Sequence, residues 1–372
     1  MFNASLSRFR MIGELPDVFM MENGQRVQSK EDWKKHRDTL YKWAVDFQYG
    51  CIPPDPEFLE VETLYESSYI SCYHIHTGRI DCPITFQMQI VFPYEKADKY
   101  PVIIDGDGCF RYMYTDAFME PVKKAGIAFV RFNRTELEHD IRKEHTEGLR
   151  KVYPDHKFTS LAAWAWGYHR CVDAVMKLGI ADEKLIAFTG HSRGAKTALL
   201  AGATDERATI VNPNAACSGA GACYRVHTET LCEDGVVRPS STLEKMSDFP
   251  DWFTPELLSY AGKEETLPMD CHFIKALVAP RVLLITEAVS DAWSNPAGVY
   301  ITHRATKEVY RFLNAEENVM VHYRNGFHLH DARDMEILVN VIRHMQGKEA
   351  LDKNIGVSPF ENLPLGYTWK CP

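Results

Sequence analysis

The spacing of hydrophobic and polar positions changes along the chain, and the changes predict where helices and strands lie. Residues 30–43 are charged with apolar side chains at helical intervals, which is typical of a surface helix, and Ser29 stands where an N-cap is expected. Residues 69–75 and 84–92 instead alternate apolar and polar side chains on either side of Thr77-Gly78-Arg79. This period of two predicts an antiparallel hairpin.

Short apolar runs rich in β-branched residues follow the hairpin and alternate with helical segments. We expect these strands at residues 100–105, 125–132, 185–189, 283–286 and 319–323, and helices before residue 125 and at 161–178 and 335–345. Strands that alternate with helices form a parallel sheet covered on both faces. The sequence therefore predicts an α/β fold, a three-layer sandwich around a mostly parallel central sheet with antiparallel N-terminal strands at one edge.

The chain is expected to form a single domain over residues 1–372, because no internal repeat or low-complexity linker divides it. Residues 1–60 are expected to be a helical lead-in that ends at a cluster of prolines. Residues 217–266 carry many polar and small side chains without a periodic core. We expect this segment to be an irregular insertion near the mouth of a site.

Composition excludes several classes of function. Of 372 residues, 45% are hydrophobic and 25% are charged, which is ordinary for a soluble globular protein. The 42 Lys and Arg against 51 Asp and Glu give a net charge of −9, which argues against a nucleic-acid partner. No apolar run of about 18 residues exists to cross a membrane, so we expect no membrane partner either.

The sequence also indicates where in the cell the protein is found and whether its cysteines are free. The first ten residues lack the apolar core of a secretion signal, so we expect a cytoplasmic protein as sequenced, or a secreted or periplasmic one if a signal was removed. The ten cysteines form no Cys-x-x-Cys pair, which favours free thiols over a zinc site. If the protein is exported, one or two disulfides are the alternative.

The strongest local motif is Gly190-His191-Ser192-Arg193-Gly194, a Gly-x-Ser-x-Gly pattern between a strand-like run and an Ala/Leu-rich segment. A strand, a sharp turn and a helix in this order are typical of a nucleophile elbow. Such a turn places Ser192 Oγ at a helix N-terminus, where the N–H of Arg193 can face a developing oxyanion. The alternative is an ordinary strand-to-helix turn with a capping serine.

A serine nucleophile needs a base, and in the elbow topology the acid and the histidine follow the serine. His328 lies in a loop after the last expected strand, where catalytic groups gather in open α/β sheets, and His330 is its main rival. Asp291, in the loop after the preceding strand, is the favoured acid, and Glu287 is the alternative. Either carboxylate could instead be a helix cap or a surface group.

Two further patterns suggest metal chemistry only weakly. His74 and His76 share one face of an expected strand, but the sequence offers no third ligand, and a solvated strand face is favoured. The segment Asp105-Gly106-Asp107-Gly108 resembles a calcium loop but has Asp116, not Glu, at the twelfth position. We therefore expect no metal and no organic cofactor.

Taken in order, these motifs resemble the glucuronoyl esterases, carbohydrate esterase family fifteen, and especially the bacterial branch of that family in the α/β-hydrolase superfamily. The segments that carry the resemblance are Leu15-Pro16-Asp17, Asn23-Gly24, 161–167, 190–196, 249–253, 267–270, 276–281, 291–298 and 324–328. The resemblance implies an α/β-hydrolase fold. It also implies cleavage of 4-O-methylglucuronate esters of the xylan–lignin type through an acyl-enzyme.

The resemblance further implies the roles of individual residues. Ser192 would be the nucleophile, His328 the general base, and Arg193 a stabiliser of the oxyanion. At the sugar, the family pattern implies that Lys196 would bind hydroxyls, Glu229 would contact ring hydroxyls and Trp293 would stack or hydrogen-bond. Lys196 could instead be a solvated helix residue, and Trp293 a packing residue.

One position departs from the family pattern. Many members carry a catalytic Glu just before Ser-Gly-x-Gly, and here Cys217 stands in its place. A thiol of ordinary pKa is mostly neutral at pH 7 and cannot stabilise an imidazolium, so the acid must be Asp291. The expected substrate is a small or oligosaccharide glucuronate ester. An acetylxylan-type or other carbohydrate esterase and a non-catalytic carbohydrate-binding member remain alternatives, and the oligomeric state stays open.

Overall fold

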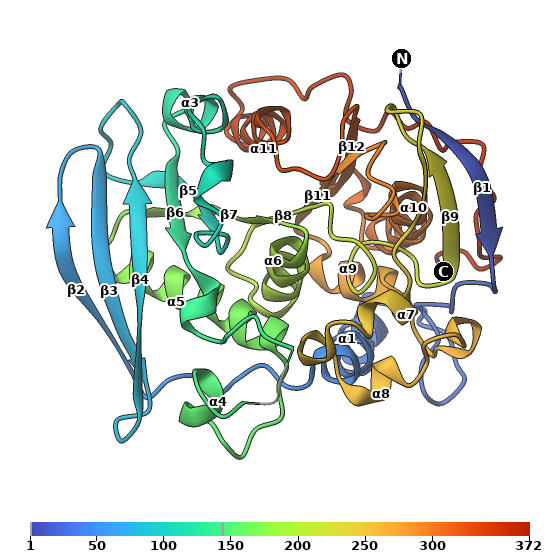
Figure 1. Cartoon of the computed structure of the whole chain (residues 1–372), viewed down its shortest axis with the longest axis horizontal. Coiled ribbons are helices and arrows are strands. Elements are labelled where there is room, and N and C mark those ends of the chain that lie inside the picture. Colours follow the sequence, from blue (N-terminus) through green and yellow to red (C-terminus); the bar gives the residue numbers. More distant parts are fainter. Residues whose placement is uncertain (1, 143–144) are drawn as a thin grey trace.

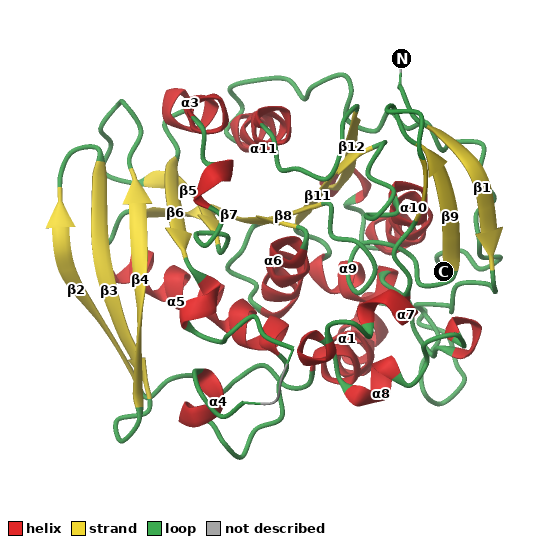
Figure 2. Cartoon of the chain, in the orientation of Figure 1, coloured by secondary structure: helices red, strands yellow, loops and turns green. Residues whose placement is uncertain are grey.

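The computed structural model describes residues 2–142 and 145–372, and its strands form two sheets. The strands are β1 (Ser5–Met11), β2 (Phe58–Glu66), β3 (Ile70–Gly78), β4 (Pro83–Val91), β5 (Tyr100–Asp105), β6 (Ala128–Phe132), β7 (Ala181–His191), β8 (Ile210–Asn214), β9 (Val226–Leu231), β10 (Val237–Pro239), β11 (Val282–Ala288) and β12 (Val319–Arg324). The large sheet has nine strands in the order β12-β11-β8-β7-β5-β6-β4-β3-β2. The small sheet has the order β1-β9-β10 (Figure 2).

The large sheet is parallel from β12 to β6 and antiparallel from β6 to β2. The expected hairpin is present as β3 and β4, joined at residues 79–82. The prediction of a mostly parallel sheet with antiparallel N-terminal strands at one edge is therefore confirmed.

Helices cover both faces of the large sheet and complete three layers (Figure 1). They are α1 (Lys30–Tyr41), α2 (Phe47–Tyr49), α3 (Asp116–Lys124), α4 (Leu149–Val152), α5 (Ser160–Lys177), α6 (Arg193–Thr204), α7 (Leu243–Met246), α8 (Pro255–Leu258), α9 (His272–Val278), α10 (Pro296–Phe312) and α11 (Ala332–Met345). A π-helical turn, Lys42–Asp46, joins α1 to α2.

The apolar core lies on the two faces of this sheet because neighbouring strand residues point to opposite sides. On β5, Ile103 packs in the cluster that contains the buried side chains of α3 and α11. Val102 and Ile104 pack in the other cluster, with α1, α5, α6, α9 and α10. Both faces are buried, so the strand is apolar without alternation, as the sequence suggested.

The first helix begins as predicted. Ser29 Oγ accepts a hydrogen bond from the N–H of Asp32 at 3.1 Å, and the Asp32 carboxylate accepts one from the N–H of Ser29, also at 3.1 Å. This reciprocal capping box satisfies two helix-terminal donors.

Two expectations about the organisation of the chain are wrong in part. Residues 1–60 do not begin as a helix, because β1 lies there, paired with β9 more than 200 residues away. Residues 217–266 are not wholly irregular, since they contain β9, β10, α7 and α8. Both errors have one cause: pairing between distant segments leaves no mark in local periodicity. Among the described residues, no helix has the length and apolar character needed to cross a membrane.

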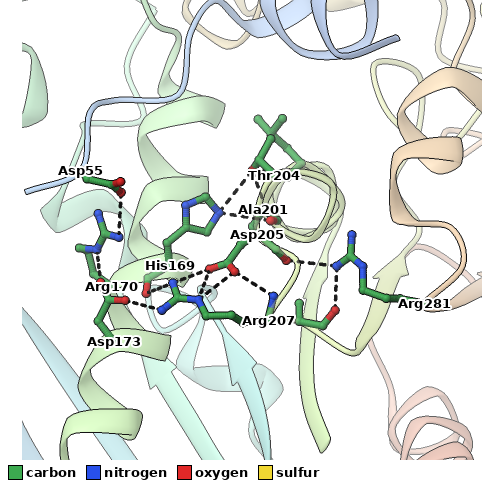
Figure 3. A network of polar contacts seen from close by, with 11 residues as sticks. Asp55, His169, Arg170, Asp173, Ala201, Thr204, Asp205, Arg207 and Arg281 are labelled. Atoms are coloured by element: carbon green, nitrogen blue, oxygen red, sulfur yellow. Dashed lines mark hydrogen bonds and ion pairs between the residues drawn. The ribbon is translucent and has the colours of Figure 1, made fainter. Parts of the chain in front are cut away.

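A network of polar contacts lies between α5, α6 and the segment before β11 (Figure 3). The guanidinium of Arg207 bonds Asp173 of α5 and Asp205, which follows α6, both at 2.6 Å. Arg281 donates to the carbonyl oxygen of Asp205 at 3.1 Å. Inside the network, His169 donates from Nε2 to the carbonyl oxygen of Ala201 at 3.2 Å. These contacts join α5, α6 and the segment before β11.

His169 makes stability sensitive to acid. Burial lowers its pKa from 6.5 to about 4. Between these pH values the imidazole is protonated in the unfolded chain and neutral in the folded chain. The stabilisation from neutral His169 is complete above about pH 6.5 and is lost as the pH falls towards about 4, at about 1.4 kcal/mol per unit. We predict that His169→Gln recovers on the order of 3 kcal/mol of this acid loss in urea unfolding. Exposed His156→Gln is the control, and an unchanged pH slope in His169→Gln would contradict the prediction.

Candidate active site

Ser192 occupies a strained turn between β7 and α6. Its φ of 57° and ψ of −114° lie outside the regions that a residue with a side chain favours. Its N–H donates to the carbonyl oxygen of Asn214 at 3.0 Å, and its carbonyl oxygen accepts from the N–H of Lys196 at 3.1 Å. The conformation of a nucleophile elbow is thus held by the backbone on both sides of the serine.

The two glycines of the motif are required by close packing. A Cβ on Gly194 would lie 2.2 Å from Asp107 Oδ1, and a Cβ on Gly190 would lie 2.6 Å from the carbonyl oxygen of Gly194. Asp107 Oδ2 accepts the N–H of His191 at 2.7 Å, and the same carboxylate forms a fully buried ion pair with Arg134. The carboxylate of Asp107 therefore fixes the backbone immediately before the serine.

His328 and Asp291 meet although they lie in different loops. Asp291 Oδ2 and His328 Nδ1 are 2.6 Å apart, and Asp291 is buried whereas the His328 side chain is 33% exposed. Two backbone hydrogen bonds join the loops. The N–H of Val289 donates to the carbonyl oxygen of Arg324 at 2.9 Å, and the N–H of Ser290 donates to that of Gly326 at 3.2 Å. A buried carboxylate thus orients an imidazole that remains open to solvent.

The imidazole lies beside the elbow. The ring of His328 is 4.4 Å, centroid to centroid, from the ring of His191, the residue before Ser192. Among the described residues no hydrogen bond joins Ser192 Oγ to His328. Catalytic hydrogen bonds often shorten only when substrate binds. Nδ1 is held by Asp291, so Nε2 is the nitrogen available to the serine.

The rival histidine and carboxylate have different surroundings. His330 is buried, packs edge-on against Phe118 at 5.0 Å between ring centroids, and burial lowers its pKa to about 3. Glu287 is fully buried and accepts a hydrogen bond from Ser294 Oγ at 2.5 Å. Burial and then the charge of Asp291 raise the pKa of Glu287 well above 4.5, which favours the neutral form of this carboxyl.

Cys217 lies near these carboxyls but carries no charge. Its side chain is fully buried, and Sγ donates to the carbonyl oxygen of Ala215 at 3.2 Å. Burial raises the pKa of the thiol to about 12. The thiol therefore cannot replace a carboxylate at pH 7.

The side chain of Arg193 points away from its own helix towards an aromatic wall. Its guanidinium bonds Asp140 Oδ2 at 2.5 Å and lies 4.8 Å from the centre of the Trp252 ring. Trp252 Nε1 donates to the other oxygen of Asp140 at 3.1 Å, and the ring stacks on Phe249 at 4.1 Å. These groups line a cavity of about 240 Å³, which Arg193, the residue after the nucleophile, helps to form.

Lys196 is not on a solvated helix face. It is 1% exposed, and Nζ donates to the carbonyl oxygen of Ala216 at 2.6 Å. Burial lowers the pKa of the ammonium group, which lies 6.0 Å from the centre of the Trp252 ring. An ammonium with one acceptor from the protein keeps further donors for a ligand.

The other two sugar-binding candidates, Trp293 and Glu229, lie in different surroundings. Trp293 follows Asp291, is 37% exposed, and accepts the N–H of Ser241 on its carbonyl oxygen at 3.3 Å. Glu229 lies on β9, where it pairs with Arg8 at 3.3 Å and lines a separate cavity of about 230 Å³. No contact among the described residues joins Glu229 to Ser192, His328 or Asp291.

Sequence inspection missed several groups that shape the site. Asp107 was noted only within a discounted calcium pattern, and Asp140, Trp252 and His191 received no role. The available signal was the position of Asp107, an acidic residue between two glycines directly after a buried strand. An acid at such a point can reach only backbone and buried cations, which indicates a structural support for the elbow.

The chain is similar in sequence to known esterases. Residues 75–314 match the family described as glucuronyl esterase, fungi. A 4-O-methyl-glucuronoyl methylesterase of Podospora anserina is 28% identical over 313 residues, which cover 82% of this chain and 61% of that protein. This chain thus matches about three fifths of the length of that relative.

Solved structures share the architecture. A carbohydrate esterase family 15 glucuronoyl esterase from Caldicellulosiruptor kristjansonii has a TM-score of 0.84 and 27% identity, covering 96% of this chain and 97% of that chain. A glucuronoyl esterase mutant from Sporotrichum thermophile, in complex with methyl 4-O-methyl-β-D-glucopyranuronate, has a TM-score of 0.72 and 20% identity, covering 93% and 92%. The latter likeness concerns the fold alone.

The geometry predicts how the serine will react with an organofluorophosphonate. Asp291→Asn should slow covalent labelling of Ser192 by about 10²- to 10⁴-fold, because the imidazole loses its orienting charge. Glu287→Gln should change the rate only a few-fold, because Glu287 bonds Ser294 and not His328, and burial already favours its neutral form. Time-resolved mass spectrometry of the intact protein measures both rates. If the labelling rate falls equally in the two variants, Asp291 is not the acid that orients His328.

Proposed function

The chain belongs to the glucuronyl esterase family, and on that premise we propose that it is a serine carboxylester hydrolase that cleaves glucuronoyl esters. The observation that carries the proposal is the 2.6 Å contact between Asp291 and His328 beside the strained turn of Ser192. A carboxylate, an imidazole and a hydroxyl in this relation are the parts of an acyl-transfer site.

In the proposed acylation step, Ser192 Oγ attacks the ester carbonyl carbon while His328 Nε2 takes the hydroxyl proton. Asp291, bonded to Nδ1, holds the ring and stabilises the imidazolium that forms. The tetrahedral oxyanion faces the N–H of Arg193 at the start of α6, where the helix dipole favours negative charge.

A second oxyanion donor would come from residues 106–109. This loop contacts the elbow through the bond from the N–H of His191 to Asp107 Oδ2, at 2.7 Å. Cys109 also lies within electrostatic range of Arg193. The Arg193 guanidinium adds positive charge, although its bond to Asp140 fixes its position.

Breakdown of the intermediate completes the cycle. The C–O bond to the alcohol breaks, and the alcohol leaves with the proton from His328 Nε2. Water then attacks the glucuronoyl–Ser192 ester, His328 takes its proton, and the free glucuronate departs as the serine recovers its hydrogen. Every proton in these steps moves through one imidazole, so the mechanism needs no metal or organic cofactor.

The substrate is a sugar ester, and we also propose which residues contact its sugar and its alcohol. Lys196 would donate from its buried ammonium to sugar hydroxyls, and Trp293 offers an exposed indole in the loop that carries the acid. Glu229 would reach the ring hydroxyls from β9. The stacked rings of Phe249 and Trp252, with the guanidinium groups of Arg142 and Arg193 over them, provide aromatic and cationic groups that could contact an aromatic alcohol.

Hydrolysis of benzyl glucuronate and of the methyl ester of 4-O-methylglucuronate tests the proposal, with acetylated xylo-oligosaccharides as competing substrates. The wild-type protein should have its higher kcat/KM on the glucuronate esters. Ser192→Ala and His328→Ala should each lower kcat by about 10⁴-fold or more, since each removes an indispensable part of the acylation step. Liquid chromatography of the released acids gives the rates.

Lys196→Met separates sugar recognition from chemistry. The variant should raise KM for glucuronate esters while hydrolysis of p-nitrophenyl acetate, which has no sugar, changes little. A higher kcat/KM on acetylated sugars would favour the acetylxylan-type alternative. A wild-type protein no more active than Ser192→Ala would favour the carbohydrate-binding one.

A further inference from the structure

Three potential metal ligands gather on the exposed face of the outermost strands of the large sheet. Glu62 of β2 and His74 and His76 of β3 each present one ligand atom, and all of these atoms lie within 4.8 Å of one another. We propose that Glu62, His74 and His76 form a binding site for a divalent transition-metal cation, with Zn²⁺ as the best-fitting ion.

Strand register brings the three side chains together. Glu62 pairs directly with His74 across β2 and β3, and His76 lies two residues further along the same face. The intervening Ile75 points into the core and is fully buried, which fixes the outward direction of both imidazoles. Register therefore supplies the third ligand that the spacing of His74 and His76 alone could not identify.

Two of the three distances between the ligand atoms are close to those around a tetrahedral ion. Glu62 Oε2 lies 3.0 Å from His76 Nε2 and 3.4 Å from His74 Nδ1. Ligands about 2.0–2.1 Å from a tetrahedral Zn²⁺ are about 3.3–3.4 Å apart, so both contacts already have nearly the length of an edge of that tetrahedron. Two imidazoles and one carboxylate are also a ligand set that Zn²⁺ takes in proteins.

A further contact orients one ligand. Thr85 Oγ1 of β4 lies 2.8 Å from His76 Nδ1, so that ring is held with Nε2 towards Glu62. Metal-binding histidines are generally fixed in this way through their second nitrogen. The side chains of Glu62, His74 and His76 are 33–55% exposed, which leaves room for water as a fourth ligand.

The position of the site suggests its effect. β2 is the edge of the nine-stranded sheet, and edge strands present unpaired backbone groups to other chains. A cation bound by β2 and β3 would clamp the edge strand to its neighbour. Four strand intervals separate β3 from β7, which precedes Ser192, a span of about 19 Å. Metal binding should therefore act on the edge strands and leave ester cleavage unchanged.

The test uses the full chain after treatment with a chelator, titrated with ZnCl₂ in a calorimeter. The wild-type protein should show one site whose affinity falls at least tenfold in His76→Gln, which can still bond Thr85. Glu62→Gln should weaken the same site, and Thr85→Val should weaken it by about 10- to 100-fold through loss of the orienting bond. His156→Ala, which removes an exposed histidine outside any such cluster, is the matched control and should bind as the wild type does.

Hydrogen exchange with and without Zn²⁺ locates the ion. Amides of β2 and β3 should exchange more slowly in the wild-type protein with Zn²⁺ and show no such change in His76→Gln. Unchanged labelling of Ser192 in the variants shows that they are folded. The proposal is overturned if His76→Gln binds Zn²⁺ as tightly as the wild type, or if protection appears around His328 instead of along β2 and β3.

Discussion

The carboxylate of Asp107 holds the part of the structure on which the site depends. Ser192 adopts a conformation that costs on the order of 1–3 kcal/mol, and such a conformation persists only where neighbouring contacts determine it. Asp107 supplies one of these contacts through the N–H of His191, and its own charge is balanced by Arg134 in a fully dry environment. Removing either partner of a buried pair leaves the other charge uncompensated, which is strongly destabilising.

The same carboxylate explains the composition of the elbow. Asp107 occupies the space that a side chain at residue 194 would fill, so glycine is required there for packing and not for a positive φ. The elbow, the preceding loop and Arg134 form one unit. The strained serine is therefore a property of the assembled loops rather than of the five-residue motif.

The carboxyls of Glu287, in β11, and of Asp291, after it, show how the environment separates the behaviour of similar groups. The pKa of Glu287, inside the sheet, is raised by burial and then by the charge of Asp291. Asp291, four residues later, reaches the imidazole of His328 because backbone bonds join the loops after β11 and β12. Parallel neighbours in a sheet end at the same edge, and this geometry lets an acid and a base 37 residues apart meet.

Local sequence determined the elements of this protein. Periodicity gave α1, α3, α5 and α11 and the strands β3–β7, β11 and β12, Ser29 gave the first cap, and the glycines around Ser192 gave the elbow. Each of these depends on residues within one or two turns of the chain. Tertiary structure alone decided the pairing of β1 with β9, the burial of Lys196, the support from Asp107 and the approach of Glu62 to His74. These features arise when segments far apart in sequence come into contact, and such contacts depend on register and packing that no short pattern of residues encodes.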